Sequence, residues 1–454
     1  MVKKPLVVAV SAACLNLSLI AAAQAAGFIE DSKATLSLRN FYYNNDNRNE
    51  ASYAARNPSK VEEWGQGFLL NYQSGFTQGT VGFGVDAIGM LGLRLDGSGH
   101  AGRSTNSNQP GTMFPRETDN SSVDEFSSLG ATAKMKISET EFRYGTLMPK
   151  LPVAVYNDGR LLPQTYQGAQ VTSKDIKNLT LTGGQLQSAK NRNSTDQDQL
   201  SIAGSNSGAL ARDSNKFNFI GGDYKVTKDL TLQYYFGQLE DFYNQHFLGL
   251  THAVKLGDGT FKTDLRYFNS KGNGDNKDAD NQNALYASSG YYGGTRTRGE
   301  VDNRLYSGLF TYSIYGHTLG LGYQNTSGDS NFPYLNEAGG ASTYTITDIQ
   351  INNFTRSGED TWQARYSYDF AQLGVKGLTA GVIYQRGDNI RTSAGNDFME
   401  WERDLTLSYV IPEGQLKGLG FTWRNAMLRT DLPAATQRDQ DENRLIVSYT
   451  LPLL

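Results

Sequence analysis

Arginine is the residue type in this chain that is best suited to binding a ligand. Arg39, Arg424 and Arg444 each lie on the polar side of a segment in which apolar and polar residues alternate. A guanidinium is charged at every physiological pH and offers two parallel N–H donors, a geometry that matches a carboxylate. A wet surface that carries several such groups is suited to binding small anions.

Side chains that support catalysis or metal binding are scarce or badly spaced. Cys14 is the only cysteine, and the four histidines are scattered along the chain: His100, His246, His252 and His317. None of them lies in a close spacing with another metal ligand. The Gly-x-Ser-x-Gly elbow of many serine hydrolases is absent from the sequence. We therefore predict no catalytic residue, no metal site and no cofactor.

Composition narrows the class of protein further. The formal net charge of −4 disfavours a nucleic-acid partner, because a phosphate backbone attracts basic surfaces. Mean hydropathy is −0.50, which is too polar for a helical membrane protein. In a membrane β-barrel only every other residue faces lipid, so a polar average is compatible with a chain that crosses a membrane.

The elements that must position the charged side chains are β-strands. Residues 128–137 alternate apolar and polar, and successive side chains of a strand point to opposite faces. The same alternation recurs at residues 34–39, 68–73, 80–87, 230–236, 261–267, 404–411 and 444–451. We predict an all-β fold, a closed antiparallel transmembrane β-barrel with an apolar outer wall. Lys, Arg, Asp and Gln on the inner wall indicate a hydrated interior, as in barrels of about 16 to 18 strands.

The first residues have the features of an export signal. Two lysines precede a mostly apolar stretch, residues 5–19, and Ala23-Gln24-Ala25 has the small-x-small form of a cleavage site. We expect a signal peptide of residues 1–25 and a transmembrane barrel of residues 26–454. A lipoprotein signal that ends at Cys14 is the alternative.

One long connection differs from the others. The segment of residues ~148–178 holds three of the eleven prolines and several apolar residues, which favour burial. We predict that this segment folds into the lumen as a constriction loop; an apolar extracellular loop packed on its neighbours is the alternative. The other long connections are polar, as extracellular loops of such barrels are: residues 96–127, 187–215, 270–303 and 325–360.

Several sequence blocks resemble the OprD family of outer-membrane carboxylate channels. The blocks span the chain from end to end and are residues 26–32, 38–43, Arg160-Leu161-Leu162-Pro163-Gln164, Trp401-Glu402-Arg403-Asp404 and residues 441–447. The resemblance implies a single-chain barrel of about 18 strands with an inward-folded third loop. It also implies a ladder of arginines that guides small carboxylates past an acidic, aromatic constriction.

Transferred to this chain, the ladder comprises Arg39, Arg160, Arg386, Arg403, Arg424, Arg444 and Lys134. Arg403 is two residues from Leu405 and therefore has the same parity in the strand, which means that its side chain points to the same outward face. It needs a bulge or a position at the rim to reach the lumen. Acidic, tyrosine and loop side chains are expected on the other side of the constriction, at Tyr156, Asp158, Tyr334 and Asn336.

These expectations describe a bacterial outer-membrane porin for small carboxylates, not an enzyme. Thr422 and Asn336 replace an arginine and an aspartate that relatives selective for basic amino acids tend to carry, so the resemblance favours benzoate-like and other monocarboxylates. The same channel selective for basic amino acids and peptides is one alternative. A serine peptidase on a barrel is the other. Expected partners are small carboxylates, outer-membrane lipid and lipopolysaccharide, with the barrel a monomer or a loose trimer.

Overall fold

The computed structural model describes most of the chain. The described residues are 27–48, 60–96, 112–118, 121–203, 212–278, 286, 288, 299–335, 342–392, 394–433 and 437–454. The predicted signal peptide, residues 1–25, and one predicted constriction residue, Asn336, lie outside the described residues.

Strand and connection alternate from one end of the chain to the other. Eighteen strands form one sheet. They are β1 (Lys33–Asn47), β2 (Lys60–Gln73), β3 (Val81–Asp96), β4 (Glu125–Ile137), β5 (Thr140–Leu147), β8 (Thr165–Ser173), β9 (Leu179–Lys190), β10 (Phe217–Lys225), β11 (Leu230–Leu239), β12 (Tyr243–Leu256), β13 (Gly259–Gly272), β14 (Asp302–Ile314), β15 (His317–Gly328), β16 (Asp360–Asp369), β17 (Leu378–Thr392), β18 (Gly395–Val410), β19 (Gly420–Thr430) and β20 (Gln440–Pro452).

Other regular structure is limited to short pieces. Strands β6 (Lys150–Leu151) and β7 (Ala154–Val155) pair only with each other. Two 3₁₀ helices, η1 (Gly274–Lys277) and η2 (Phe370–Leu373), have one turn each. Within the described residues, no helix is both long and apolar enough to cross a membrane.

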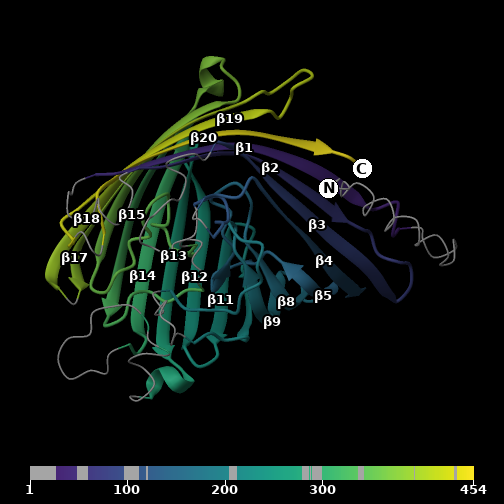
Figure 1. Cartoon of the computed structure of the whole chain (residues 1–454), viewed down its shortest axis with the longest axis horizontal. Helices are drawn as coiled ribbons and strands as arrows, with labels where there is room; N and C mark the ends of the chain where they lie inside the picture. The colour runs from purple at the N-terminus through teal and green to yellow at the C-terminus, as the bar shows by residue number, and fades with distance from the viewer. Residues whose placement is uncertain are drawn as a thin grey trace.

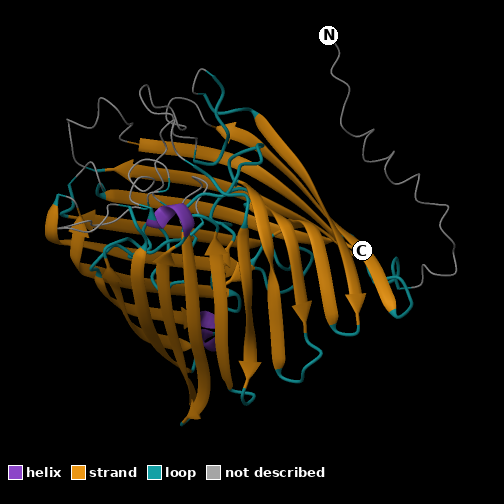
Figure 2. Cartoon of the chain, turned by 90° about the horizontal axis from the view of Figure 1, so that it is seen from below, coloured by secondary structure: helices purple, strands orange, loops and turns teal. Residues whose placement is uncertain are grey.

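The sheet closes into a barrel because its first and last strands pair. β1 is hydrogen-bonded antiparallel to β2 on one side and to β20 on the other. In Figure 1 the purple β1 and the yellow β20 run side by side. Figure 2 shows short turns at one end of the wall of strands and longer loops gathered at the other. The prediction of a closed antiparallel β-barrel is confirmed.

Apolar side chains cover the outer wall. Leu129 of β4 is 83% exposed and Leu321 of β15 is 69% exposed, and Trp362 and Trp423 are also exposed. Exposed apolar area costs free energy in water, so a wall that presents such side chains is matched to hydrocarbon. The inner wall carries polar and charged side chains at the alternate positions, as the alternation predicts.

Tight turns keep neighbouring strands in register at one end of the barrel. Tyr315 and Gly316 join β14 to β15 with φ angles of 47° and 82°. Positive φ at both central residues matches the twist of the two flanking strands, which is why glycine is favoured at such a turn. The connection between β12 and β13, Gly257-Asp258, is equally short.

The functional site is built from the described residues of four long connections at the other end. They are L2 (residues 97–124), L3 (residues 148–164), L4 (residues 191–216) and L7 (residues 329–359). L3 is shorter than the constriction loop predicted over residues 148–178, because residues 165–173 form strand β8 in the wall. L3 also contains the small hairpin of β6 and β7.

Candidate functional site

L3 packs against the inner face of β1 and β2. Leu161 and Leu162 are almost fully buried in a cluster with Phe41 of β1 and Phe114 of L2. β2 has a glycine at the contact: a Cβ at Gly67 would lie 3.0 Å from the carbonyl oxygen of Leu161. Burial of its leucines therefore holds the loop to the wall, at a position where β2 carries no side chain.

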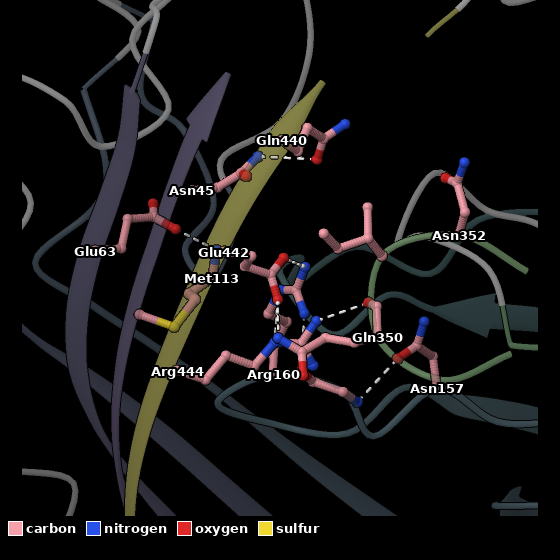
Figure 3. A network of polar contacts seen from close by, with 12 residues as sticks. Asn45, Glu63, Met113, Asn157, Arg160, Gln350, Asn352, Gln440, Glu442 and Arg444 are labelled. Atoms are coloured by element: carbon pink, nitrogen blue, oxygen red, sulfur yellow. Dashed lines mark hydrogen bonds and ion pairs between the residues drawn. The ribbon is translucent and has the colours of Figure 1, made fainter. Parts of the chain in front are cut away.

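One carboxylate on β20 joins both L3 and L7 to the wall. The Glu442 side chain forms an ion pair with Arg444 and lies 3.8 Å from the Arg160 guanidinium of L3. Arg444 donates to the carbonyl oxygen of Gln350 in L7 at 2.9 Å and to that of Gly159 in L3 at 3.4 Å. Figure 3 shows these side chains converging on the yellow β20.

A second ion pair lies at a more open place on the same side of L3. Arg39 of β1 donates to Asp158 at 2.8 Å and to the carbonyl oxygen of Arg160 at 2.7 Å. The Arg39 side chain is 29% exposed and that of Asp158 is 40% exposed. The Arg160 guanidinium lies over the Tyr43 ring at 4.4 Å, a cation–π contact. A solute can therefore reach Arg39 more easily than the buried Arg444.

L4 adds a third buried guanidinium to this region. Arg192 donates to the Asn157 side chain at 2.9 Å. Burial, followed by the nearby charges of Arg160 and Arg444, lowers the pKa of Arg192 well below its usual value. A guanidinium remains charged even so. Three guanidinium groups, those of Arg160, Arg192 and Arg444, thus lie close together near Glu442 and provide donors suited to an anion.

L7 is a second loop that is bonded to the inner wall. Glu402 of β18 accepts hydrogen bonds from the backbone N–H groups of Ile351 at 3.0 Å and Asn352 at 2.9 Å. On the other side, the Arg266 guanidinium of β13 lies 4.1 Å from the centre of the Tyr344 ring and donates to its carbonyl oxygen. From the sequence, this segment was expected to be an extracellular loop that contributes Tyr334 and Asn336 to the constriction; its hydrogen bonds to β13 and β18 were not predicted.

A cavity of about 460 Å³ opens between L7 and the wall. Gln350 of L7, Arg365 of β16, Asp404 of β18 and Arg424 of β19 are among the residues that line it. Arg424 lies directly opposite Arg444 in the register of β19 and β20. Its Nε atom is buried and has no hydrogen-bond partner among the described residues. The Arg424 side chain also lines the cavity, so a ligand there can contact its guanidinium.

Arg39, Arg160, Arg424 and Arg444 lie in one region, as the predicted ladder requires. Arg424 and Arg444 are paired across neighbouring strands, and Arg444 reaches the L3 backbone. Arg39 and Arg160 are joined through the L3 backbone.

Arg386 and Arg403 are on the outer face, so their placement in the ladder is wrong. Arg386 is flanked in register by Trp362 and Trp401, which belong to the outer wall. Arg403 donates to Asn425 at 2.7 Å and keeps the outward parity of Leu405. Both register irregularities between β17 and β18 lie beyond Gly387, so no bulge turns Arg403 inward.

Lys134 points inward, but its ammonium group is already paired with a carboxylate. Its ammonium is buried, lies 2.7 Å from the Asp86 carboxylate and donates to the Ser74 carbonyl oxygen at 2.7 Å. These bonds stabilise the wall of β3 and β4, and the place of Lys134 in the ladder stays a prediction.

The predicted constriction residues occupy different environments. Asp158 is paired with Arg39. The Tyr156 carbonyl oxygen accepts a hydrogen bond from Ser342 of L7 at 3.3 Å. Tyr334 packs on the apolar cluster of L3 and L4, and this burial raises its pKa. Tyr156 and Asp158 thus lie where L3 meets L7 and β1, whereas Tyr334 packs against the apolar cluster that supports the loops.

The sequence analysis missed three cations that face the same space: Arg192, Arg266 and Arg365. Arg266 lies on the polar side of the alternation over residues 261–267. Arg365 occupies the corresponding place between Ala364 and Tyr366, so parity alone could have found both. Arg192 lies in a loop, and no local pattern identifies it.

Together, a closed barrel with an apolar outer wall and a loop-narrowed, cation-rich inner wall defines an outer-membrane porin. The family model described as "outer membrane porin, OprD family" matches residues 26–453, and the chain belongs to this family. Its homologues are channels and not enzymes.

Individual relatives cover nearly the whole chain. The porin-like protein GalP of Pseudomonas putida is 36% identical over 441 residues, which is 97% of each chain. The crystal structure of OccK8 (OprE) of Pseudomonas aeruginosa is 60% identical, with a TM-score of 0.85 over 94% of this chain and 100% of that one. A BenF-like porin from Pseudomonas fluorescens is 37% identical, with a TM-score of 0.81 and the same coverage.

Proposed function

We propose that this porin is selective for small monocarboxylates, including aromatic ones, which pass along Arg39, Arg160, Arg192, Arg424 and Arg365. The observation that carries the proposal is the position of Arg424, whose side chain lines a cavity of about 460 Å³ and forms no hydrogen bond or ion pair with another described residue. L3 and L7 narrow the route that leads to it.

The physical reason for arginine lies in the hydration of the carboxylate. A carboxylate that enters a narrow pore loses part of its hydration, at a cost of several kcal/mol unless the lost hydrogen bonds are replaced. A guanidinium replaces them with two parallel donors. Several such groups in series bind the ion firmly enough to admit it and weakly enough to release it to the next.

The rest of the substrate is inferred from the acidic groups of the site. Asp158 is paired with Arg39, Glu442 with Arg444, and the buried Asp348 accepts two hydrogen bonds from Thr343. These three carboxylates already have partners. Asp404, which lines the cavity with Arg424, has no hydrogen-bond partner among the described residues and is the acidic group left to meet a cationic end of the solute. A crystal structure of the Pseudomonas aeruginosa relative OpdK, 35% identical, is described with vanillate, an aromatic carboxylate.

Flux of benzoate, arginine and a neutral sugar into liposomes tests the proposal. Benzoate is expected to enter fastest, and Arg424→Gln is expected to weaken benzoate block of single channels roughly tenfold, the equivalent of about 1.4 kcal/mol. Arg403→Gln, on the outer face of the neighbouring strand, is the matched control. Arginine entering faster than benzoate would support the basic amino-acid alternative instead.

The proposal also covers cleavage of the signal peptide and the oligomeric state. We infer that residues 1–25 are removed as a signal peptide, so that the mature chain starts at Ala26. The intact mass of the protein purified from outer membranes measures this directly. Light scattering in detergent distinguishes a monomer from a loose trimer.

A further inference from the structure

A row of hydrogen-bonded amide side chains crosses the outer wall near the end that carries the long loops. Gln185, Asn218, Gln238 and Asn244 lie opposite one another in the register of β9 to β12. Gln185 donates to Asn218 at 2.8 Å, Asn218 to Gln238 at 3.3 Å, and Gln238 to Asn244 at 2.9 Å. We call these four residues the amide row.

Charged side chains continue the amide row onto the next two strands. Lys271 of β13 lies opposite Asn244 and forms an ion pair with Asp302 of β14. Two residues further along β14, Arg304 is exposed on the same face. Within the described residues, its guanidinium has no hydrogen bond or ion pair.

The amide row lies at the boundary of the apolar band. On the same strands, one step further from the loops, Ile220 is 63% exposed and lies opposite Phe236. On β12 and β13 the residues in line with them are His246 and Asn269, and the exposed Leu248 and Tyr267 lie one step further from the loops. Amides that face hydrocarbon cost free energy, so the row marks the level where acyl chains give way to headgroups. Long loops of outer-membrane barrels are extracellular, so this level belongs to the outer leaflet.

We propose that the amide row with Lys271 and Arg304 binds the phosphorylated glucosamine headgroup of lipopolysaccharide. Along the row, Gln185 donates one N–H, Asn244 accepts one, and Asn218 and Gln238 do both. Each amide retains a further N–H and a further lone pair for sugar hydroxyls. Arg304 supplies a two-pronged donor for a phosphate, and Lys271 supplies a second cation. The site lies on the outer wall and is independent of the substrate proposed for the lumen.

Thermal unfolding of the mature barrel in detergent tests the proposal. Added lipopolysaccharide is expected to raise the Tm of the unmodified protein, because a ligand that binds only the folded state stabilises it. Phosphatidylglycerol, which has a phosphate but no sugar amide or hydroxyl array, should raise it much less. Arg304→Gln and the double variant Asn218→Leu/Gln238→Leu should each lose most of the lipopolysaccharide shift while single-channel conductance stays unchanged.

Arg386→Gln is the matched control, since Arg386 is an outward-facing arginine on β17 that is paired with Asp388. It should keep the full shift. Arg304→Gln alters one exposed side chain, so it remains informative if the double variant does not fold. The proposal is overturned if Arg304→Gln and the double variant both keep the rise in Tm with lipopolysaccharide, or if phosphatidylglycerol gives an equal rise. It is also overturned if the variants change only the oligomeric state, which would make the row a contact between copies of this chain.

Discussion

The neighbours of an arginine, more than its charge, determine what that residue does in this pore. Arg444 is bonded to Glu442 and to the backbone of both loops, so it supports the structure. Arg424 lies directly across the strand pair, yet its Nε has no partner among the described residues. We therefore propose different functions for two arginines at adjacent positions on one wall.

Parity along a strand predicts which wall a residue belongs to, and it identified Arg39, Arg424 and Arg444 correctly. The family resemblance also placed Arg403 and Arg386 in the lumen. The alternation contradicted this placement for Arg403 and was not considered for Arg386, and both residues are on the outer face. Parity does not report partners, however. The ion pair of Lys134 with Asp86 could not be predicted, because it depends on the register between β3 and β4.

A charge introduced on the outer wall is expected to destabilise the inserted barrel far more than the same charge at the neighbouring residue, which faces the inner wall. Leu407→Arg places a guanidinium in the apolar band and should destabilise the inserted barrel by about 2–4 kcal/mol. Thr406→Arg, on the inner wall, should leave insertion close to normal. The folded fraction in lipid vesicles as a function of urea measures both; equal losses would contradict the assignment of the two walls.

At the scale of elements, the position of L3 depends on the absence of a side chain on β2. Gly67→Leu should push L3 away from the wall, because even a Cβ would lie 3.0 Å from the Leu161 carbonyl oxygen. We expect higher single-channel conductance and weaker benzoate selectivity in planar bilayers.

Gly89→Leu is the control for this substitution. Gly89 lies on the outer face of the adjacent β3, and a Cβ there would be 3.6 Å from Leu70, an ordinary contact. This variant should conduct like the unmodified protein. If Gly67→Leu also does, L3 does not set the width of the pore.

L7 contains a titratable group that should make its docking depend on pH. Asp348 is buried and accepts hydrogen bonds from the Thr343 N–H and hydroxyl, and burial raises its pKa. A raised pKa means that the docked loop prefers the neutral acid. Docking is therefore strongest below the ordinary aspartate range and weakens as pH rises through the raised pKa.

Hydrogen exchange of L7 amides measures this dependence. Protection should fall between acidic and neutral pH in the unmodified protein, and Asp348→Asn should remove the decline. Asp229→Asn, in a short turn at the other end of the barrel, should not. A decline that persists unchanged in Asp348→Asn would assign the dependence to another group.

Strands were easier to predict than loops for a physical reason. Alternation is a local property of the sequence, whereas L7 is fixed by contacts with β13, β16 and β18 that are distant in the chain. L3 was recognised because it contains prolines and leucines. L7 is polar, and its backbone provides most of its bonds to the wall, so its composition gave no sign of them.

At the scale of the whole molecule, closure rests on one strand pair between the two ends of the barrel. Ser37 and Thr450 lie opposite each other on β1 and β20, with their hydroxyl oxygens 3.0 Å apart. Cys14 is the only cysteine and belongs to the predicted signal peptide. The double variant Ser37→Cys/Thr450→Cys should therefore form an intramolecular disulfide on oxidation.

The cross-link is read as a mobility shift on a non-reducing gel, with unchanged conductance. Ser37→Cys/Ser408→Cys is the control, because β19 and β20 separate Ser408 from β1. The control pair should not cross-link. Failure of the first pair to cross-link would show that β1 and β20 do not meet in this register.

The sharing of Glu442 has a mechanical consequence. Since Arg160 from one loop and Gln350 from the other are both held through the Glu442–Arg444 pair, a displacement of either loop is transmitted to the other. The narrowest section should thus widen and contract as a unit, and current fluctuations should switch between few discrete levels. Arg444→Gln removes the guanidinium that is bonded to the backbone of both loops, and it would spread those fluctuations over many levels without enlarging the mean current.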